Sequence, residues 1–173
     1  MSIKTTAILT AIIVLISHPL PVKAEIPFES WSIERRASEA HIEDVDEFIL
    51  ISSITEAESN RSQTDNEGRI MVAICILNRV NDETGRFPNT ISGVIGQSGQ
   101  FSTCRRHSDG SLYSVTERTD LSDLAVIEAV RRIESGEAPA VLWFNCIGFC
   151  SWGTPYRNPE SANGTYGGNY FST

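Results

Sequence analysis

Residues 47–80 contain two helical patterns joined by a short polar loop. In the first, apolar residues recur at helical spacing from Val45 onward, which predicts a helix with one buried face. The second begins near Glu67 and is apolar on almost every side, which predicts a buried central helix. If Arg79 near its end is buried, it needs an acid or several carbonyl groups as partners. A chain organised around such a pair is mainly helical.

The first of these helices ends in two acidic residues, Glu56 and Glu58. A carboxyl group at a helix end, packed against an apolar helix, is partly desolvated and keeps a proton near neutral pH. A general acid requires such a proton. Because residues two positions apart do not share a helix face, we expect one of the two to face a cleft and the other to face water. The alternative is that both are solvated helix-end acids.

Residues 1–24 have the features of a secretory signal peptide. Lys4 supplies the basic region, residues 7–16 the apolar run, and Ala24 ends a small-residue cleavage site. Prolines interrupt the apolar run before it reaches the roughly 20 residues that a membrane span needs, so a membrane tether is the weaker alternative. We therefore expect an exported protein in the periplasm or outside the cell, with no stable membrane insertion after cleavage.

The remaining chain of about 149 residues has the length of one compact domain. The net charge is -8, from 14 Lys+Arg against 22 Asp+Glu, and such an acidic chain lacks the cationic surface for binding nucleic acid. Residues 25–45 predict an N-terminal arm or capping helix, anchored by Trp31 and Ile33, before a domain over residues 46–173. We expect a monomer without a cofactor or bound metal.

The four cysteines, Cys75, Cys104, Cys146 and Cys150, all follow the predicted signal peptide, so the oxidising compartment permits disulfides. Cys75 fits a buried position in its helix. Spacing leaves the connectivity open, and we favour one bridge from Cys104 to either Cys146 or Cys150. Zinc is the alternative, because His107 and three of these sulfurs form a suitable set of ligands.

Smaller elements follow in the second half of the chain. Asn89 or Thr90 suits the cap of a short helix, and Asp109-Gly110 suits the turn of a small hairpin. Residues 121–134 predict a helix that Gly136 stops, and residues 140–145 are β-prone. Together the patterns predict an α+β, mainly helical, single domain with a small β element and a loop-rich C-terminal tail.

A short polar segment with one aromatic ring, Gln100-Phe101-Ser102, is suited to binding a sugar. Sugar hydroxyls need donors and acceptors, and the face of a sugar ring needs an apolar wall. Trp143, Asn145 and Tyr170 offer the same kinds of group near the C-terminus. A glycine-containing turn stapled by Phe101 is an equally good interpretation of the first segment alone.

Several short motifs occur in a fixed order along residues 47–171. They are Thr55-Glu56-Ala57, Gly68, Leu77-Asn78-Arg79-Val80, Phe87-Pro88, Val94-Ile95, Gln100-Phe101-Ser102, Pro139 and Trp143-Phe144-Asn145. In this order they resemble the SleB-type cell wall hydrolases, the spore-cortex-lytic family and its relatives. That family is similar in fold to lysozymes and lytic transglycosylases, and the resemblance implies that Glu56 is the catalytic acid.

The resemblance implies a glycosidase that cleaves peptidoglycan between N-acetylmuramic acid and N-acetylglucosamine, with Glu56 as general acid and then base. Activation of the sugar's 6-hydroxyl gives an anhydro product, and activation of water gives hydrolysis with Glu58 as the possible second acid. The sequence departs from the family pattern at Glu58, where arginine is common, at Asn60 in place of an acid, and at Asn169 in place of histidine. The alternatives are a non-catalytic peptidoglycan-binding envelope protein and a zinc-dependent hydrolase.

Overall fold

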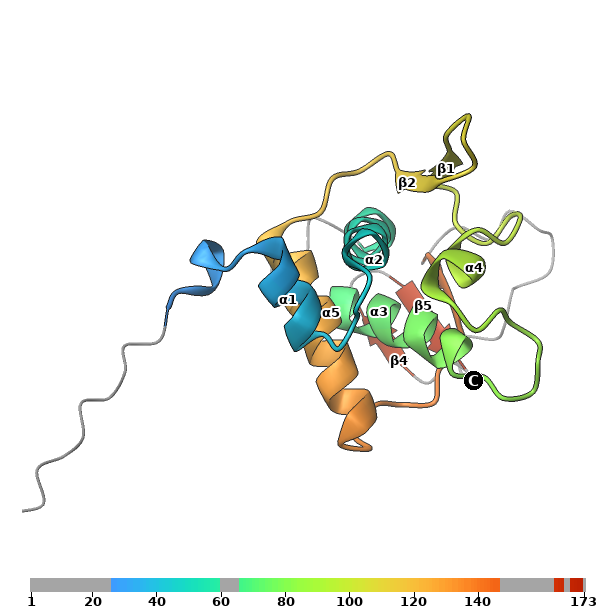
Figure 1. Cartoon of the computed structure of the whole chain (residues 1–173). Coiled ribbons are helices and arrows are strands. Elements are labelled where there is room, and N and C mark those ends of the chain that lie inside the picture. The colour runs from blue at the N-terminus through green and yellow to red at the C-terminus, as the bar shows by residue number, and fades with distance from the viewer. Residues whose placement is uncertain (1–25, 60–65, 147–163, 167–168, 173) are drawn as a thin grey trace, which may run out of the picture.

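The computed structural model describes residues 26–59, 66–146, 164–166 and 169–172 (Figure 1). In chain order, its helical elements are η1 (Phe28–Ser30), α1 (Ile33–Glu39), α2 (Val45–Glu58), α3 (Glu67–Val80), α4 (Ile91–Ile95) and α5 (Asp120–Glu134). The strands are β1 (Cys104–Arg106), β2 (Leu112–Ser114), β3 (Trp143–Cys146), β4 (Gly164–Tyr166) and β5 (Asn169–Ser172). This order confirms the α+β, mainly helical fold class.

Helix α3 is the centre of the core, packed against both α2 and α5. Most of its side chains are buried, including Val72, Ile74 and Ile76 at 0% exposure, which confirms the central helix that its apolar pattern predicts. Helix α2 contributes Phe48 and Ile54 to the same core. At the outer edge of the α3–α5 interface, Arg132 binds the carboxylate of Glu67 through two nitrogens, at 2.6 and 3.0 Å.

The helix ends have local causes that the sequence displays. Asp44 caps α2 by accepting hydrogen bonds from the first-turn backbone, and Thr90 caps α4 by accepting one from the Gly93 amide. Thr119 and Ser122 form a reciprocal capping box at the start of α5. Beyond the end of α5, Gly136 has φ +74°, a left-handed conformation that glycine adopts without a steric cost.

Two small sheets complete the domain. Strands β1 and β2 form the predicted hairpin, with Gly110 at φ +93° in its turn. The other sheet has the order β3-β5-β4, with both pairs antiparallel. Its strands β4 and β5 lie in the C-terminal tail, which was predicted to be rich in loops. Phe171 of β5 lies opposite Phe144 and is fully buried, so the end of the tail covers the core.

The N-terminal arm packs on the domain through a charged residue. Arg36 of α1 is 5% exposed and donates to Asp120 and Asp123 at 2.5 and 2.6 Å. Its guanidinium also lies 4.4 Å from the centre of the Phe28 ring. The predicted anchors, Trp31 and Ile33, are only partly buried, and the arm is attached both by this ion pair with the first turn of α5 and by the buried Ala37 and Ala40.

Within the described part of the chain, no helix combines the length and the apolar character needed to cross a lipid bilayer. The predicted signal peptide lies outside the described residues.

Candidate functional site

Glu56 occupies the last turn of α2 and is buried, with 4% exposure. Arg69, in the first turn of α3, donates two hydrogen bonds to the Glu56 carboxylate. Nε donates to Oε2 at 2.8 Å and Nη2 donates to Oε1 at 3.1 Å. The Thr119 hydroxyl donates to Oε2 at 2.9 Å. Three separate helices therefore converge on one carboxylate.

The helix ends near this carboxylate act on its charge in opposite ways, because the C-terminal end of its own helix α2 disfavours an anion while two helix N-termini favour one. Thr119 is the N-cap of α5, and its hydroxyl oxygen accepts a hydrogen bond from the Ser122 amide while its proton points to Glu56. Arg69 lies in the first turn of α3. Helix N-termini carry a partial positive charge, so the starts of α3 and α5 both stabilise an anion placed beside them.

The surroundings of Glu56 differ from those that the sequence analysis predicted. The apolar pattern of α3 predicted an apolar contact that would hold a proton on the carboxyl group. The structure instead places a guanidinium there, and a bidentate ion pair favours the ionised carboxylate. Burial of Glu56 agrees with the prediction, whereas the contact with Arg69 does not.

Glu58 faces a different part of the molecule from Glu56. Its side chain is half-buried and accepts a hydrogen bond from the Thr103 hydroxyl at 2.6 Å. Its backbone carbonyl accepts one from the buried Asn169 side chain at 3.0 Å. The end of α2 thus meets both the segment before the hairpin and the C-terminal strand. Asn169 therefore has a structural contact here.

Three of the predicted sugar-binding residues, Gln100, Phe101 and Trp143, lie around Arg79. Arg79 is 3% exposed, and it donates to the Gln100 side-chain oxygen at 3.2 Å and to the Leu142 carbonyl at 2.7 Å. The rings of Phe87, Phe101 and Trp143 lie 5.1 to 5.7 Å from its guanidinium carbon. Phe101 is 5% exposed and packs in the core, and its stacking on a sugar stays a prediction. Arg79 has the carbonyl partner that the sequence analysis required of it.

Further placements of the predicted sugar-binding residues are as follows. Ser102 is exposed, and its backbone carbonyl accepts a hydrogen bond from Arg105 at 2.6 Å. Trp143 is half-buried, with its ring centre 5.5 Å from that of Phe87. Asn145 and Tyr170 are opposite each other in the β3–β5 pair, and their side chains lie outside the described part of the structure. The backbone therefore brings these two positions together.

Cys104 has a free thiol, whose pKa burial raises. The predicted bridge from Cys104 is therefore absent, while the side chain of Cys146 and the whole of Cys150 lie outside the described residues. Cys75 is buried in α3, as predicted. His107 stacks on Tyr113 with ring centres 4.2 Å apart. Among the described residues, no three potential ligands come together as a metal site.

Sequence reasoning missed Arg69 and Thr119 as site residues. The signal for Arg69 was present, because a charged residue in an otherwise apolar, buried helix must have a partner. The partner itself depends on how α3 packs against α2, which the local pattern does not show. Thr119 lies just before the helix predicted for the residues that follow it, but nothing local indicates that its proton faces another helix.

Comparisons with known proteins bear on this site. The chain resembles in fold the crystal structure of the catalytic domain of the Bacillus cereus SleB protein, with a TM-score of 0.51 and 24% identity, over 75% of this chain and 91% of that one. A comparison with curated proteins gives no match. The model of a protein family described as cell wall hydrolase matches residues 63–157. Arg69 and Thr119 fall inside that range, and Glu56 precedes it.

The family match spans more than half of the chain, and the fold agrees with that of a catalytic domain that carries the SleB name. The chain therefore belongs to the cell wall hydrolase family and is an enzyme that acts on peptidoglycan.

Proposed function

We propose that this enzyme cleaves the glycosidic bond between N-acetylmuramic acid and N-acetylglucosamine, with Glu56 as its general acid and base. The convergence of Arg69 and Thr119 on one buried carboxylate is the observation that carries this proposal. Buried carboxylates with specific charge partners are a feature of active sites. The resemblance of Thr55-Glu56-Ala57 to the family's acidic motif supports the same residue.

In the proposed reaction, protonated Glu56 transfers its proton to the glycosidic oxygen as the bond from that oxygen to the sugar carbon breaks. The sugar carbon becomes an oxocarbenium-like centre, and Glu56 becomes a carboxylate. The carboxylate then takes a proton from the sugar's 6-hydroxyl as that oxygen attacks the same carbon. This step closes a 1,6-anhydro ring and returns the proton to Glu56.

Arg69 and Thr119 have a defined role in this cycle. They stabilise the carboxylate that exists after the first proton transfer, through three hydrogen bonds. The same contacts reduce the protonated fraction of the resting enzyme near neutral pH, because the guanidinium favours the charged form. We therefore expect activity to increase as the pH falls from neutral, as long as the fold persists.

The anhydro product is the one we favour, with lytic transglycosylase as the activity class. The contacts of Glu56 include a guanidinium and a hydroxyl, and Glu58 is engaged by Thr103. If water replaces the 6-hydroxyl, Glu58 is the proposed second acid of a muramidase. The proposed sugar contacts remain Gln100, Phe101, Ser102, Trp143, Asn145 and Tyr170. Residues 1–24 remain a proposed export signal.

The test compares the wild type with Glu56→Gln, a replacement of the same shape that cannot carry the proton. We expect at least about a hundredfold loss of muropeptide release, as is typical when a general acid is removed. Mass spectrometry of the digests distinguishes anhydro from hydrolysed ends. Glu58→Gln is the matched control, and we expect it to retain most activity. Full activity of Glu56→Gln would remove this residue from the mechanism.

A further inference from the structure

Two recesses lie next to each other over the outer face of α2. The first, of about 560 Å³, is bordered by the N-terminal arm and the start of α5, and its lining includes Trp31 and Thr119. The second, of about 380 Å³, is bordered by the β1–β2 hairpin, and its lining includes Tyr113. Both recesses are lined by Ile49, Ser53 and Glu117. They therefore form one continuous depression, here named the α2 trough.

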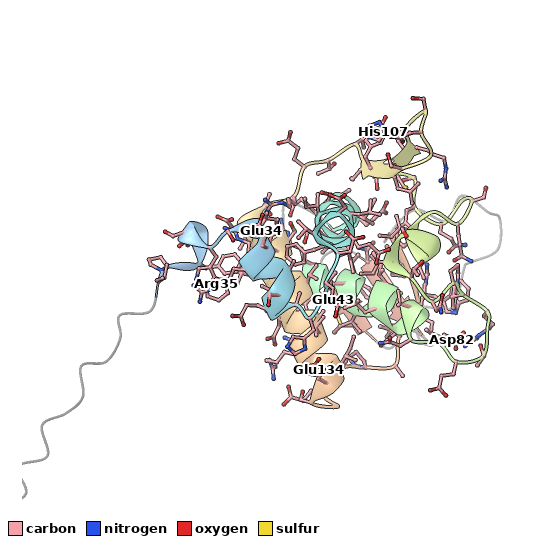
Figure 2. The ribbon with its side chains drawn as sticks, viewed as in Figure 1. Glu34, Arg35, Glu43, Asp82, His107 and Glu134 are labelled. Carbon is pink, nitrogen blue, oxygen red and sulfur yellow. The ribbon has the colours of Figure 1, made fainter. Side chains whose placement is uncertain are left out.

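The hairpin and α1 flank α2 in the fold (Figure 1). His107 on the hairpin and Arg35 on α1 mark the two sides in the view with side chains (Figure 2). The trough therefore runs across α2 from the arm to the hairpin.

The lining of the trough has the chemistry that a saccharide requires. Ser53, Ser114 and Thr119 contribute hydroxyl groups. Charged groups of both signs also line it, namely Arg36, Arg118, Asp46, Glu117 and Asp120. The floor includes Ile49, which is 36% exposed and offers an apolar surface. Sugar hydroxyls and acetamido groups require such mixed donors and acceptors beside an apolar wall.

An aromatic ring stands near each end of the trough, and both rings are held in place. Tyr113 is 39% exposed and stacks on His107 with ring centres 4.2 Å apart. The Trp31 indole donates to the Ile26 carbonyl at 3.0 Å, and the Arg35 guanidinium lies 3.7 Å from its ring centre. Rings fixed before binding lose little conformational freedom when a ligand arrives.

The trough reaches the proposed catalytic residue through Thr119. This threonine lines the first recess, and its hydroxyl donates to the Glu56 carboxylate at 2.9 Å. A glycan strand lying in the trough would therefore be separated from Glu56 only by the Thr119 side chain. We infer that the α2 trough binds the peptidoglycan glycan strand on one side of the cleaved bond, with Tyr113 as the platform for a sugar ring. This inference rests on the proposed function.

The test measures binding of a soluble tetrasaccharide of alternating N-acetylglucosamine and N-acetylmuramic acid, by calorimetry, to the full exported chain. The Glu56→Gln background keeps the strand intact. Tyr113→Ala should weaken binding by about tenfold, the effect of removing a central ring contact. Ile49→Arg fills the trough from its floor and should weaken binding similarly. A disaccharide, which is too short to occupy the trough and the cleavage position together, should be much less affected.

The matched control is Leu124→Ala on α5. Leu124 has the same 39% exposure as Tyr113 and does not line either recess. It should leave binding unchanged, and all variants should keep the wild-type thermal midpoint because the altered side chains are exposed. Equal tetrasaccharide affinity in Tyr113→Ala, Ile49→Arg and their parent overturns the inference, even if Glu56→Gln is inactive. Cleavage by Glu56→Gln instead overturns the proposed function, and retention on insoluble sacculi then still reports on the trough.

Discussion

Helix α3 buries an arginine near each of its ends, and the two have different surroundings. Arg69 in the first turn forms a bidentate ion pair with Glu56. Arg79 in the last turn has a carbonyl, an amide oxygen and three aromatic rings around it. In the described part of the chain, no carboxylate contacts Arg79. One arginine therefore forms an ion pair, and the other lies in a neutral cage, defined here as the carbonyl, the amide oxygen and the three rings around Arg79.

The direction of the helix dipole contributes to this difference. A positive charge is favourable near a helix C-terminus, where Arg79 lies, and unfavourable near an N-terminus, where Arg69 lies. Arg69 therefore depends on its carboxylate partner, and that partner can change its charge by taking up a proton. Arg79 depends on groups that do not titrate. The Arg69–Glu56 pair is therefore suited to proton transfer, whereas the contacts of Arg79 are suited to stabilising the fold.

The largest expected effect comes from breaking the ion pair. Arg69→Met removes the guanidinium that the structure pairs with a buried carboxylate, and the cost should be about 3–5 kcal/mol at pH 7. The cost should be smaller at pH 4, because a proton on Glu56 removes the buried charge. Urea unfolding at the two pH values measures this difference.

The double variant Arg69→Met/Glu56→Gln is the control for this prediction. It removes both charges, so its stability should be close to that of the wild type and should depend less on pH. The single variant also tests the mechanism, because losing the guanidinium leaves more Glu56 protonated at a given pH. The alkaline limb of its pH–rate profile should therefore move to higher pH. If the alkaline limb of the pH–rate profile stays at the wild-type pH, Arg69 does not influence the protonation of Glu56.

A smaller effect is expected at the other end of the helix. Arg79→Leu leaves the Leu142 carbonyl and the Gln100 amide without this donor and opens space between three rings, at a cost of about 2–4 kcal/mol. This cost should be the same at pH 4 and pH 7, because the partners do not titrate over that range. Urea unfolding with Arg79→Lys as the conservative control measures it. A strong pH dependence would contradict the neutral cage.

The same contrast explains which features were predictable from the sequence. The bounds of α2, α3 and α5 follow from apolar spacing and from caps such as Thr119, which act within a few residues. Strand β5 was missed because it pairs with β3, which lies far away in the sequence. Strand β4 was missed because it pairs with β5, its neighbour in the chain, and so depends on the same sheet. Phe101 is a proposed sugar contact because its type suits a sugar, and its burial was not predictable, because residue type does not distinguish a ring in a core from a ring in a cleft.

The site was predictable in part for the same physical reason. Burial of Glu56 followed from its position at the end of a helix that packs on an apolar neighbour. The identity of that neighbour did not follow, because the side chain that reaches a carboxylate depends on how two helices cross. The arm was expected to be held by apolar residues, and the buried Arg36–Asp123 pair was equally invisible in the local pattern.

The smallest effect is expected where the same kind of ion pair lies at the surface. Glu128 on α5 binds Arg131 and Arg132, whose guanidinium hydrogen bonds lower its pKa to about 2. A lowered pKa in the folded state stabilises the protein above the ordinary value of 4.5, and this stabilisation is lost as the pH falls toward about 2. Because the pair is solvated, Glu128→Gln should cost only about 0.5 kcal/mol at pH 7, measured by urea unfolding. Added salt should reduce this cost further, whereas the cost of Arg69→Met should persist, since salt screens exposed charges more than buried ones. If Glu128→Gln lowered the free energy of unfolding as much as Arg69→Met does, burial would not explain the difference between the two ion pairs.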